Sequence, residues 1–260
     1  MSSIKVLYED NHIIAVVKPA GVLTQGDGSG EKSMFDMVKD YIRIKKGKPV
    51  GNACPVRNSE GSERKISNGV FLGLVHRLDK PVQGIVLFAK TSKGAARLSE
   101  QFRNHTIQKT YHAIVLGKPK ENRGEIKEKI NKISFFAEGF TEKSDEELLA
   151  EIKKATKTRT AELSWEVVPT SPRLRGASSK YTLLKITPRT GRFHQIRVQM
   201  SGMGNPILGD KKYSEAKNDG WRDDKSIALA ATAISFKSAT GDKQINLEIP
   251  LPESWNKYLQ

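Results

Sequence analysis

Cysteine is almost missing from this sequence, because Cys54 is the single one among 260 residues. One thiol cannot close an intramolecular disulfide, and it cannot supply the paired ligands of a structural zinc site. The sequence also lacks an apolar run as long as a transmembrane helix, and residues 1–5 lack the apolar core of a signal peptide. We therefore expect a cytoplasmic protein that binds neither a metal nor a membrane.

Acidic residues are too few to balance the basic ones. The chain has 44 Lys and Arg against 29 Asp and Glu, a formal net charge of +15. Such an excess indicates a polyanionic partner, because basic side chains that neutralise phosphates release counterions. A basic protein of the membrane surface is the alternative. With 37% hydrophobic residues, the chain still has enough apolar side chains for a core.

Short apolar strands and amphipathic helices are intermixed along the chain. The predicted strands are residues 5–9, 13–17, 70–74, 85–89, 108–116, 159–168, 180–187, 227–236 and 244–249. Four helices are predicted. The first follows Ser33, the second covers residues 93–104 after a Ser92 cap, the third covers residues 145–155, and the fourth begins near Phe193. The strands come without the regular intervening helices of a doubly wound sheet. We therefore expect an α+β fold with a mixed, largely antiparallel central sheet and flanking helices and loops.

We expect residues 1–260 to form a single domain. Residues 46–69 are rich in Gly, Asn, Ser, Lys and Arg and have almost no apolar periodicity, so they are predicted to be a flexible loop. Residues 117–157 are predicted to be an insertion between two strands.

The most informative segment is His76-Arg77-Leu78-Asp79, in a turn between two predicted strands. Loops that rigid strands hold in place are where catalytic groups concentrate. The alternative for an isolated motif of this kind is a solvated surface turn, in which Asp79 pairs with Arg77 or Lys80.

Two further segments contain candidate functional side chains. Residues 109–115 place Tyr111 on a strand, where a tyrosine by itself usually serves packing. In residues 190–198, Arg192 and Arg197 lie near the start of a predicted helix, where backbone N–H groups also favour anions. Phe193, Ile196 and Met200 have the spacing of one buried helix face.

These elements, in this order, resemble the RluA-type family of pseudouridine synthases. The family motif H-R-L-D-x-x-T-S-G corresponds to residues 76–84, K-x-Y-x-A-x-V to residues 109–115, and T-G-R-x-H-Q-I-R-V to residues 190–198. Residues 17–21 and 205–213 are further matches, and the resemblance covers roughly residues 4–253.

The resemblance implies the pseudouridine synthase catalytic fold and an isomerase that converts uridines of ribosomal or transfer RNA to pseudouridine. It implies that Asp79 is the catalytic aspartate, that Arg197 pairs with it, and that Tyr111 stacks on the uracil or assists at C5. The residues implied in RNA or substrate binding are His76, Arg77, Lys109, Arg192 and His194. The target base is flipped out of its stem, and neither a metal nor an organic cofactor is implied.

The segment departs from the family pattern at Val82 and Gln83, where the family has Thr-Ser. This motivates an alternative hypothesis, a catalytically impaired RNA-binding or ribosome-assembly protein on the same fold. The route at Asp79 is also open, because a carboxylate can attack C1′ or remove the C2′ proton. The sequence leaves no room for the S4-type RNA-binding module of many relatives, so we expect the catalytic domain itself to bind RNA. A monomer is the default expectation for the oligomeric state.

Overall fold

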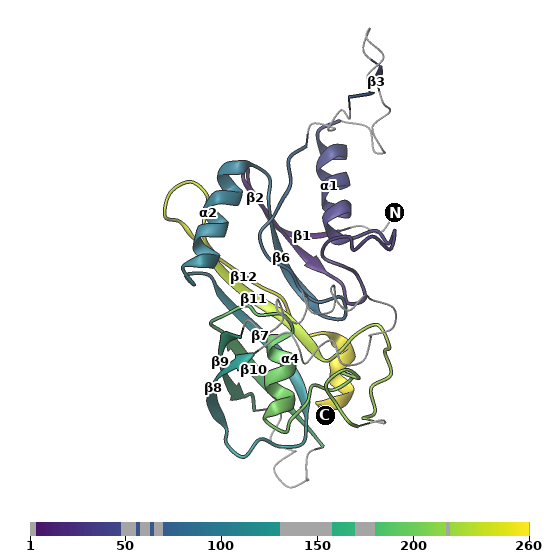
Figure 1. Cartoon of the computed structure of the whole chain (residues 1–260), viewed down its shortest axis with the longest axis vertical. Coiled ribbons are helices and arrows are strands. Elements are labelled where there is room, and N and C mark those ends of the chain that lie inside the picture. The colour runs from purple at the N-terminus through teal and green to yellow at the C-terminus, as the bar shows by residue number, and fades with distance from the viewer. Residues whose placement is uncertain are drawn as a thin grey trace, which may run out of the picture. The chain divides into compact units, whose positions relative to one another are not determined.

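The computed structural model describes residues 4–47, 56–57, 63–64, 70–130, 158–169, 180–216 and 219–259 (Figure 1). The chain divides into two compact units: Met1–Ile107 with Ala230–Pro250, and Gln108–Leu229 with Leu251–Gln260. The expectation of a single domain stays a prediction. The predicted helix at residues 145–155 lies outside the described residues, as do most of the predicted loop and much of the predicted insertion. Within the loop, β3 (Val56–Arg57) and β4 (Glu63–Arg64) pair antiparallel.

The first unit contains a mixed sheet. Its strands are β1 (Lys5–Glu9), β2 (Ile13–Lys18), β5 (Gly73–Leu74), β6 (Gln83–Ala89), β11 (Leu229–Lys237) and β12 (Gln244–Glu248). They follow the order β1-β2-β6-β11-β12, and β5 also pairs with β6. β6 is antiparallel to β2 and parallel to β11, which makes the sheet mixed as predicted. β2 and β6 are buried along almost their whole length, as expected of continuous apolar runs covered on both faces.

Two helices belong to the first unit. α1 (Met34–Lys45) begins with the predicted Ser33 cap, completed by a reciprocal contact with Asp36. α2 (Ser92–Arg103) begins one residue earlier than predicted. Its cap is Thr91, whose hydroxyl accepts a hydrogen bond from the amide of Gly94 at 3.1 Å, whereas Ser92 is already helical.

Apolar side chains from these strands and from α2 form the core of the first unit. Its fully buried members include Ala15 on β2, Leu87 on β6, Leu98 on α2 and Phe236 on β11. At about 25 cal/mol per Å² of apolar surface, burial of such side chains is the main force that holds the strands together.

The second unit contains an antiparallel sheet in the order β7-β10-β9-β8. These strands are β7 (Gln108–Leu116), β10 (Tyr181–Pro188), β9 (Arg159–Val167) and β8 (Arg123–Ile130), and β8 occupies part of the predicted insertion. The unit also includes α4 (Gln195–Gly202) and the short 3-10 helix η3 (Glu253–Tyr258). No helix in the described part of the chain is long and apolar enough to cross a membrane.

The predicted helix near Phe193 differs from the observed one. α4 begins only at Gln195, so Ile196 and Met200 are buried on it as predicted, whereas Phe193 precedes it and is 52% exposed. The reason is His194, whose backbone adopts a left-handed conformation with φ of 50° and therefore ends the helical periodicity.

Gly84 on β6 permits a close approach of β11. It has φ of 139°, and a Cβ atom there would collide with the backbone of Ala231. We expect Gly84→Ala to lower the free energy of unfolding by about 3 kcal/mol, because strain and overpacking add. Urea unfolding measures this. Gly26→Ala is the matched control, since nothing lies within 4 Å of its Cβ position, and its effect should stay within about 1 kcal/mol. Equal effects of the two substitutions would contradict the prediction.

Candidate active site

Asp79 lies in the turn between β5 and β6 of the first unit, and hydrogen bonds fix the backbone before and after it. The Thr24 hydroxyl donates to the carbonyl of Leu78 at 2.7 Å and accepts from the amide of the same residue at 3.1 Å. The amide of Val82 donates to the carbonyl of Asp79 at 3.1 Å and closes the turn. Arg77, by contrast, is exposed. The fold thus presents a carboxylate on a fixed turn with an accessible guanidinium two residues before it.

A fully buried lysine stabilises the same turn. The Lys18 ammonium donates to the carbonyls of Val22, Pro19 and Lys80 at 2.7, 3.0 and 3.1 Å. Burial lowers the pKa of Lys18 to about 7, and electrostatic attraction to Asp79 opposes that shift. Lys18 therefore satisfies three carbonyls around the turn and contributes an ammonium group that attracts Asp79.

His76 attaches the turn to its surroundings. Its Nε2 accepts a hydrogen bond from the amide of Leu87 on β6 at 2.9 Å, and its ring centroid lies 4.9 Å from that of Phe102 on α2. An imidazole that accepts at Nε2 is neutral and carries its proton on Nδ1. These contacts favour positioning of the turn, and RNA binding by His76 stays a prediction.

Arg197 on α4 is buried against a carboxylate in the second unit. Its Nε and Nη2 donate to the two carboxylate oxygens of Asp210, each at 2.7 Å, and both side chains are almost fully buried. The guanidinium carbon lies 5.0 Å from the ring centroid of Tyr213. Asp79 belongs to the other unit, so its pairing with Arg197 stays a prediction.

His194 links this cluster to the protein surface. Its Nδ1 lies 2.9 Å from the Tyr213 hydroxyl, and its ring stacks on Phe193 with centroids 3.9 Å apart and planes at 15°. Burial, together with the charges of Arg197 and Lys212, lowers the pKa of His194 to about 3. The imidazole is therefore neutral at physiological pH.

The turn before α4 is organised by Gln195, which is buried. Its side-chain oxygen accepts from the Thr190 hydroxyl at 2.7 Å and from the amide of Arg192 at 3.0 Å, and its nitrogen donates to the carbonyl of Glu162 at 3.1 Å. The Nε of Arg192 donates to the carbonyl of Thr160 at 3.0 Å. The hydrogen bonds from Gln195 to Glu162 and from Arg192 to Thr160 fix the turn against β9.

Lys109 and Tyr111 project from one face of β7, because they are two residues apart on a strand. The Lys109 ammonium lies near the turn before α4, since a Cβ atom on Gly191 would be 3.7 Å from its Nζ. Burial lowers the pKa of Lys109 to about 8. The structure thus brings Lys109, Arg192, His194 and Arg197 into one region of the second unit.

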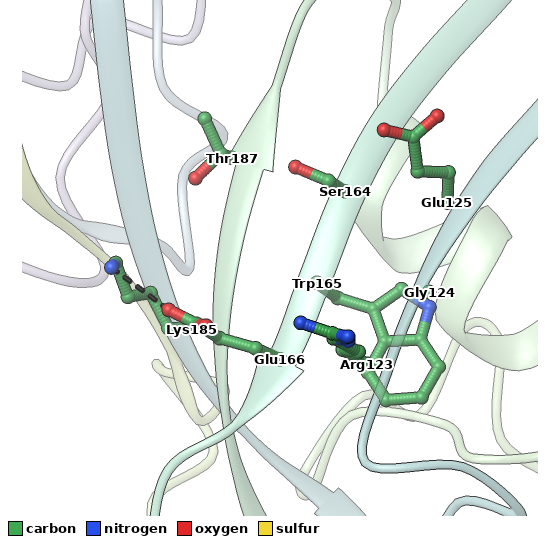
Figure 2. A pocket seen from close by; sticks show the side chains of 8 residues that line it. All are labelled: Arg123, Gly124, Glu125, Ser164, Trp165, Glu166, Lys185 and Thr187. Carbon is green, nitrogen blue, oxygen red and sulfur yellow. Dashed lines mark hydrogen bonds and ion pairs between the residues drawn. The ribbon is translucent and has the colours of Figure 1, made fainter.

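A separate pocket of about 470 Å³ lies on the sheet of the second unit, as Figure 2 shows. It is lined by Arg123, Gly124, Glu125, Ser164, Trp165, Glu166, Lys185 and Thr187. Its charges compensate one another, because Lys185 pairs with Glu166 at 2.9 Å in a cross-strand row that also includes Arg123. It contains none of the predicted site residues, and we assign it no part in catalysis.

Sequence reasoning missed the residues that hold the predicted ones in place. Lys18 and Asp210 lie in segments that matched the family motifs, but they received no role there, and Thr24 carried no signal at all. Within the described residues, no group of three or more His, Cys, Asp or Glu side chains could hold a metal ion.

Replacing Lys18 by methionine tests the buried ammonium. The folded pKa of about 7 lies below the ordinary value of 10.5, so the unfolded state binds more protons between these two pH values. The contribution of Lys18 to the free energy of unfolding should therefore be constant below pH 7 and rise above it, by at most about 1.4 kcal/mol per pH unit.

The measurement is the difference in unfolding free energy between wild type and Lys18→Met from pH 6 to pH 9. The exposed Lys5→Met is the control and should give a difference that does not change over this range. A flat difference for Lys18→Met as well would show that the lysine is not desolvated.

The comparisons with known proteins agree with this arrangement. A family model described as RNA pseudouridylate synthase matches residues 12–202. The chain is 32% identical to a ribosomal large subunit pseudouridine synthase C of Rickettsia bellii, over 96% of this chain and 69% of that protein. It is 28% identical to a tRNA pseudouridine synthase C of Haemophilus ducreyi, over 96% of this chain and 92% of that protein.

Solved structures share the fold. Human RNA pseudouridylate synthase domain containing 4 superposes with a TM-score of 0.67 at 22% identity, over 98% of this chain and 91% of that one. Human RNA pseudouridylate synthase domain containing 1 gives 0.66 at 18% identity, over 98% of this chain and 87% of that one. The predicted α+β class with a mixed sheet is confirmed. With its motifs, its fold and its relatives in agreement, the chain belongs to the RNA pseudouridylate synthase family.

Proposed function

We propose that this synthase isomerises uridines in ribosomal or transfer RNA, with Asp79 as the catalytic carboxylate. The observation that carries the proposal is the turn of residues 76–82, in which Lys18 and Thr24 hold the backbone around Asp79. The printed names of the relatives supply the two RNA classes, since one is a ribosomal large subunit enzyme and another a tRNA enzyme.

The reaction breaks the N1–C1′ bond of uridine and joins C5 of the same uracil to C1′. Asp79 either attacks C1′, forming a bond that breaks again when C5 attacks, or removes the C2′ proton and returns it after the uracil has turned. The proton on C5 leaves in the last step, and N1 gains one. Both routes need a carboxylate whose position is fixed, which the held turn supports.

Arg197 is proposed to pair with Asp79 in the catalytic complex, with Asp210 as its positioning residue. Asp210 occupies the Nε and Nη2 edge of the guanidinium, which fixes the plane of the group and the direction of its remaining N–H donors. The Tyr213 ring supports the same guanidinium. This arrangement suits an arginine that binds the Asp79 carboxylate while the Asp210 carboxylate fixes its orientation.

Substrate contacts are proposed for further groups of the two units. Tyr111 is proposed to stack on the uracil or to assist in removing the C5 proton. Arg77 is exposed beside Asp79 and is suited to contact the flipped nucleotide or its phosphate. Lys109, whose ammonium lies near Gly191, and Arg192, the next residue after Gly191, are proposed to bind phosphates. The contacts of His76 and His194 favour a positioning role for both.

Asp79→Asn tests the catalytic assignment. We expect it to abolish tritium release from RNA labelled at uridine C5, because the amide can neither attack C1′ nor act as a base. RNA affinity and thermal stability should stay close to wild type. The assay uses ribosomal and transfer RNA pools separately, so the pool that releases tritium identifies the substrate class.

The exposed Asp242→Asn is the matched control and should retain full activity. Turnover by Asp79→Asn would overturn the assignment. Wild-type protein that binds RNA but releases no tritium from either pool would favour the impaired RNA-binding protein. We would not expect Val82 to be the cause, because its side chain is buried as an apolar group of nearly the same shape as threonine.

Arg197→Lys tests the role of the fixed guanidinium. Lysine keeps the charge but cannot form the two-bond contact with Asp210, so we expect kcat to fall roughly 100-fold. Arg189→Lys, at an exposed arginine of the same unit, should keep kcat within about twofold. Multiple-turnover tritium release at saturating RNA measures kcat for both variants. Wild-type kcat for Arg197→Lys would contradict the proposed role.

A further inference from the structure

Phe193 is one of the few large apolar side chains on the surface of the described residues. Its exposed fraction is 52%, and the other exposed large apolar side chains of the described residues are Phe71 and Ile44. It occupies the position that the family motif T-G-R-x-H-Q-I-R-V leaves open, between two residues proposed for the site, Arg192 and His194. A single exposed phenylalanine is ordinary by itself, so its neighbours decide whether this ring can contact a substrate.

One face of the Phe193 ring packs against a neighbouring ring. It stacks on His194 with centroids 3.9 Å apart and planes at 15°. His194 is fixed in turn by its left-handed backbone, its contact with the Tyr213 hydroxyl at 2.9 Å, and the edge-on packing of the Tyr213 ring. The Ser201 hydroxyl donates to the carbonyl of Tyr213 at 2.6 Å, which ties this stack to α4. The phenyl ring is therefore backed on one side by a chain of contacts that leads to α4.

Cationic side chains neighbour this ring. Arg192 precedes it in the chain, and the charge of the exposed Lys212 acts on His194. Arg197 also acts on His194, but it is buried and its charge is paired with Asp210. His194 itself is neutral, so the stack presents an apolar aromatic pair within a cationic region. Cations beside an aromatic surface are the combination with which proteins bind single-stranded nucleic acid: the cations bind phosphates, and the ring stacks on a base.

We propose that Phe193 is a stacking platform for an unpaired base of the RNA substrate, separate from the uridine that is isomerised. The inference rests on the proposed action on RNA and adds a contact that the family motif does not specify. A protein partner fits the region less well, because one phenyl ring among cations offers little of the continuous apolar area that a stable protein interface needs.

Two probes of equal charge separate base stacking from phosphate binding. One is a 12-nucleotide oligouridylate, and the other is the same ribose-phosphate chain without bases. Fluorescence anisotropy gives the dissociation constant of the full-length protein for each probe. We expect wild type to bind the oligouridylate at least about 10-fold more tightly than the abasic chain, and Phe193→Leu to lose most of this preference.

Two further variants sharpen the test. Phe193→Trp should keep or increase the preference, because indole stacks at least as well as phenyl, whereas leucine offers apolar area without an aromatic face. Lys212→Gln is the phosphate control and should weaken both probes by the same factor, with a smaller dependence of affinity on salt. Thermal unfolding should be unchanged in all three, since the replaced side chains are exposed.

The proposal fails if wild type does not distinguish the two probes. It also fails if Phe193→Leu weakens both probes equally, or if Phe193→Trp binds as weakly as Phe193→Leu. Failure of the proposed function has a different signature: wild-type protein would release no tritium from either RNA pool while the preference for the oligouridylate persists.

Discussion

The burial of Lys18 is the constraint on which the turn around Asp79 depends. The antiparallel register of β2 and β6 sets Lys18 opposite Gly84, so the end of β2 lies beside the turn that enters β6. From there the ammonium reaches three carbonyls, including that of Lys80, directly after Asp79. A slip of one residue in this register would point Lys18 to the other face of the sheet. The position of the carboxylate is thus tied to strand pairing within the core.

The second unit fixes its cationic group by a related principle. A buried guanidinium is tolerated only when its charge and its donors are satisfied, and Asp210 does both for Arg197. The segment that carries Asp210 also supplies Tyr213, which contacts Arg197 and His194 together. The same contacts that satisfy the arginine therefore hold the Phe193 stack, so the proposed catalytic pairing of Arg197 and the proposed base contact share one support.

Much of the secondary structure could be predicted from apolar periodicity. The strand at Gln108–Leu116 agrees in both bounds, because apolar residues and flanking polar turns mark its ends. The prediction was wrong for Phe193, because i, i+3, i+7 spacing cannot reveal the left-handed residue His194 that interrupts the helix. The cap of α2 was wrong by one residue, since adjacent Thr91 and Ser92 carry the same chemical signal.

The sequence by itself determined the family, the α+β class, the basic charge and the identity of Asp79, Tyr111 and Arg197 as the residues to consider. These follow from local motifs and composition, which need no knowledge of distant neighbours. Only the tertiary structure decided what surrounds them: that Lys18 is buried beneath the turn, and that Asp210 is the carboxylate described on Arg197. Lys18 and its partner Lys80 are 62 positions apart, and Arg197 and Asp210 are 13 positions apart, with the end of α4 between them. Strand register and the return of the chain after α4 bring these groups within hydrogen-bonding distance.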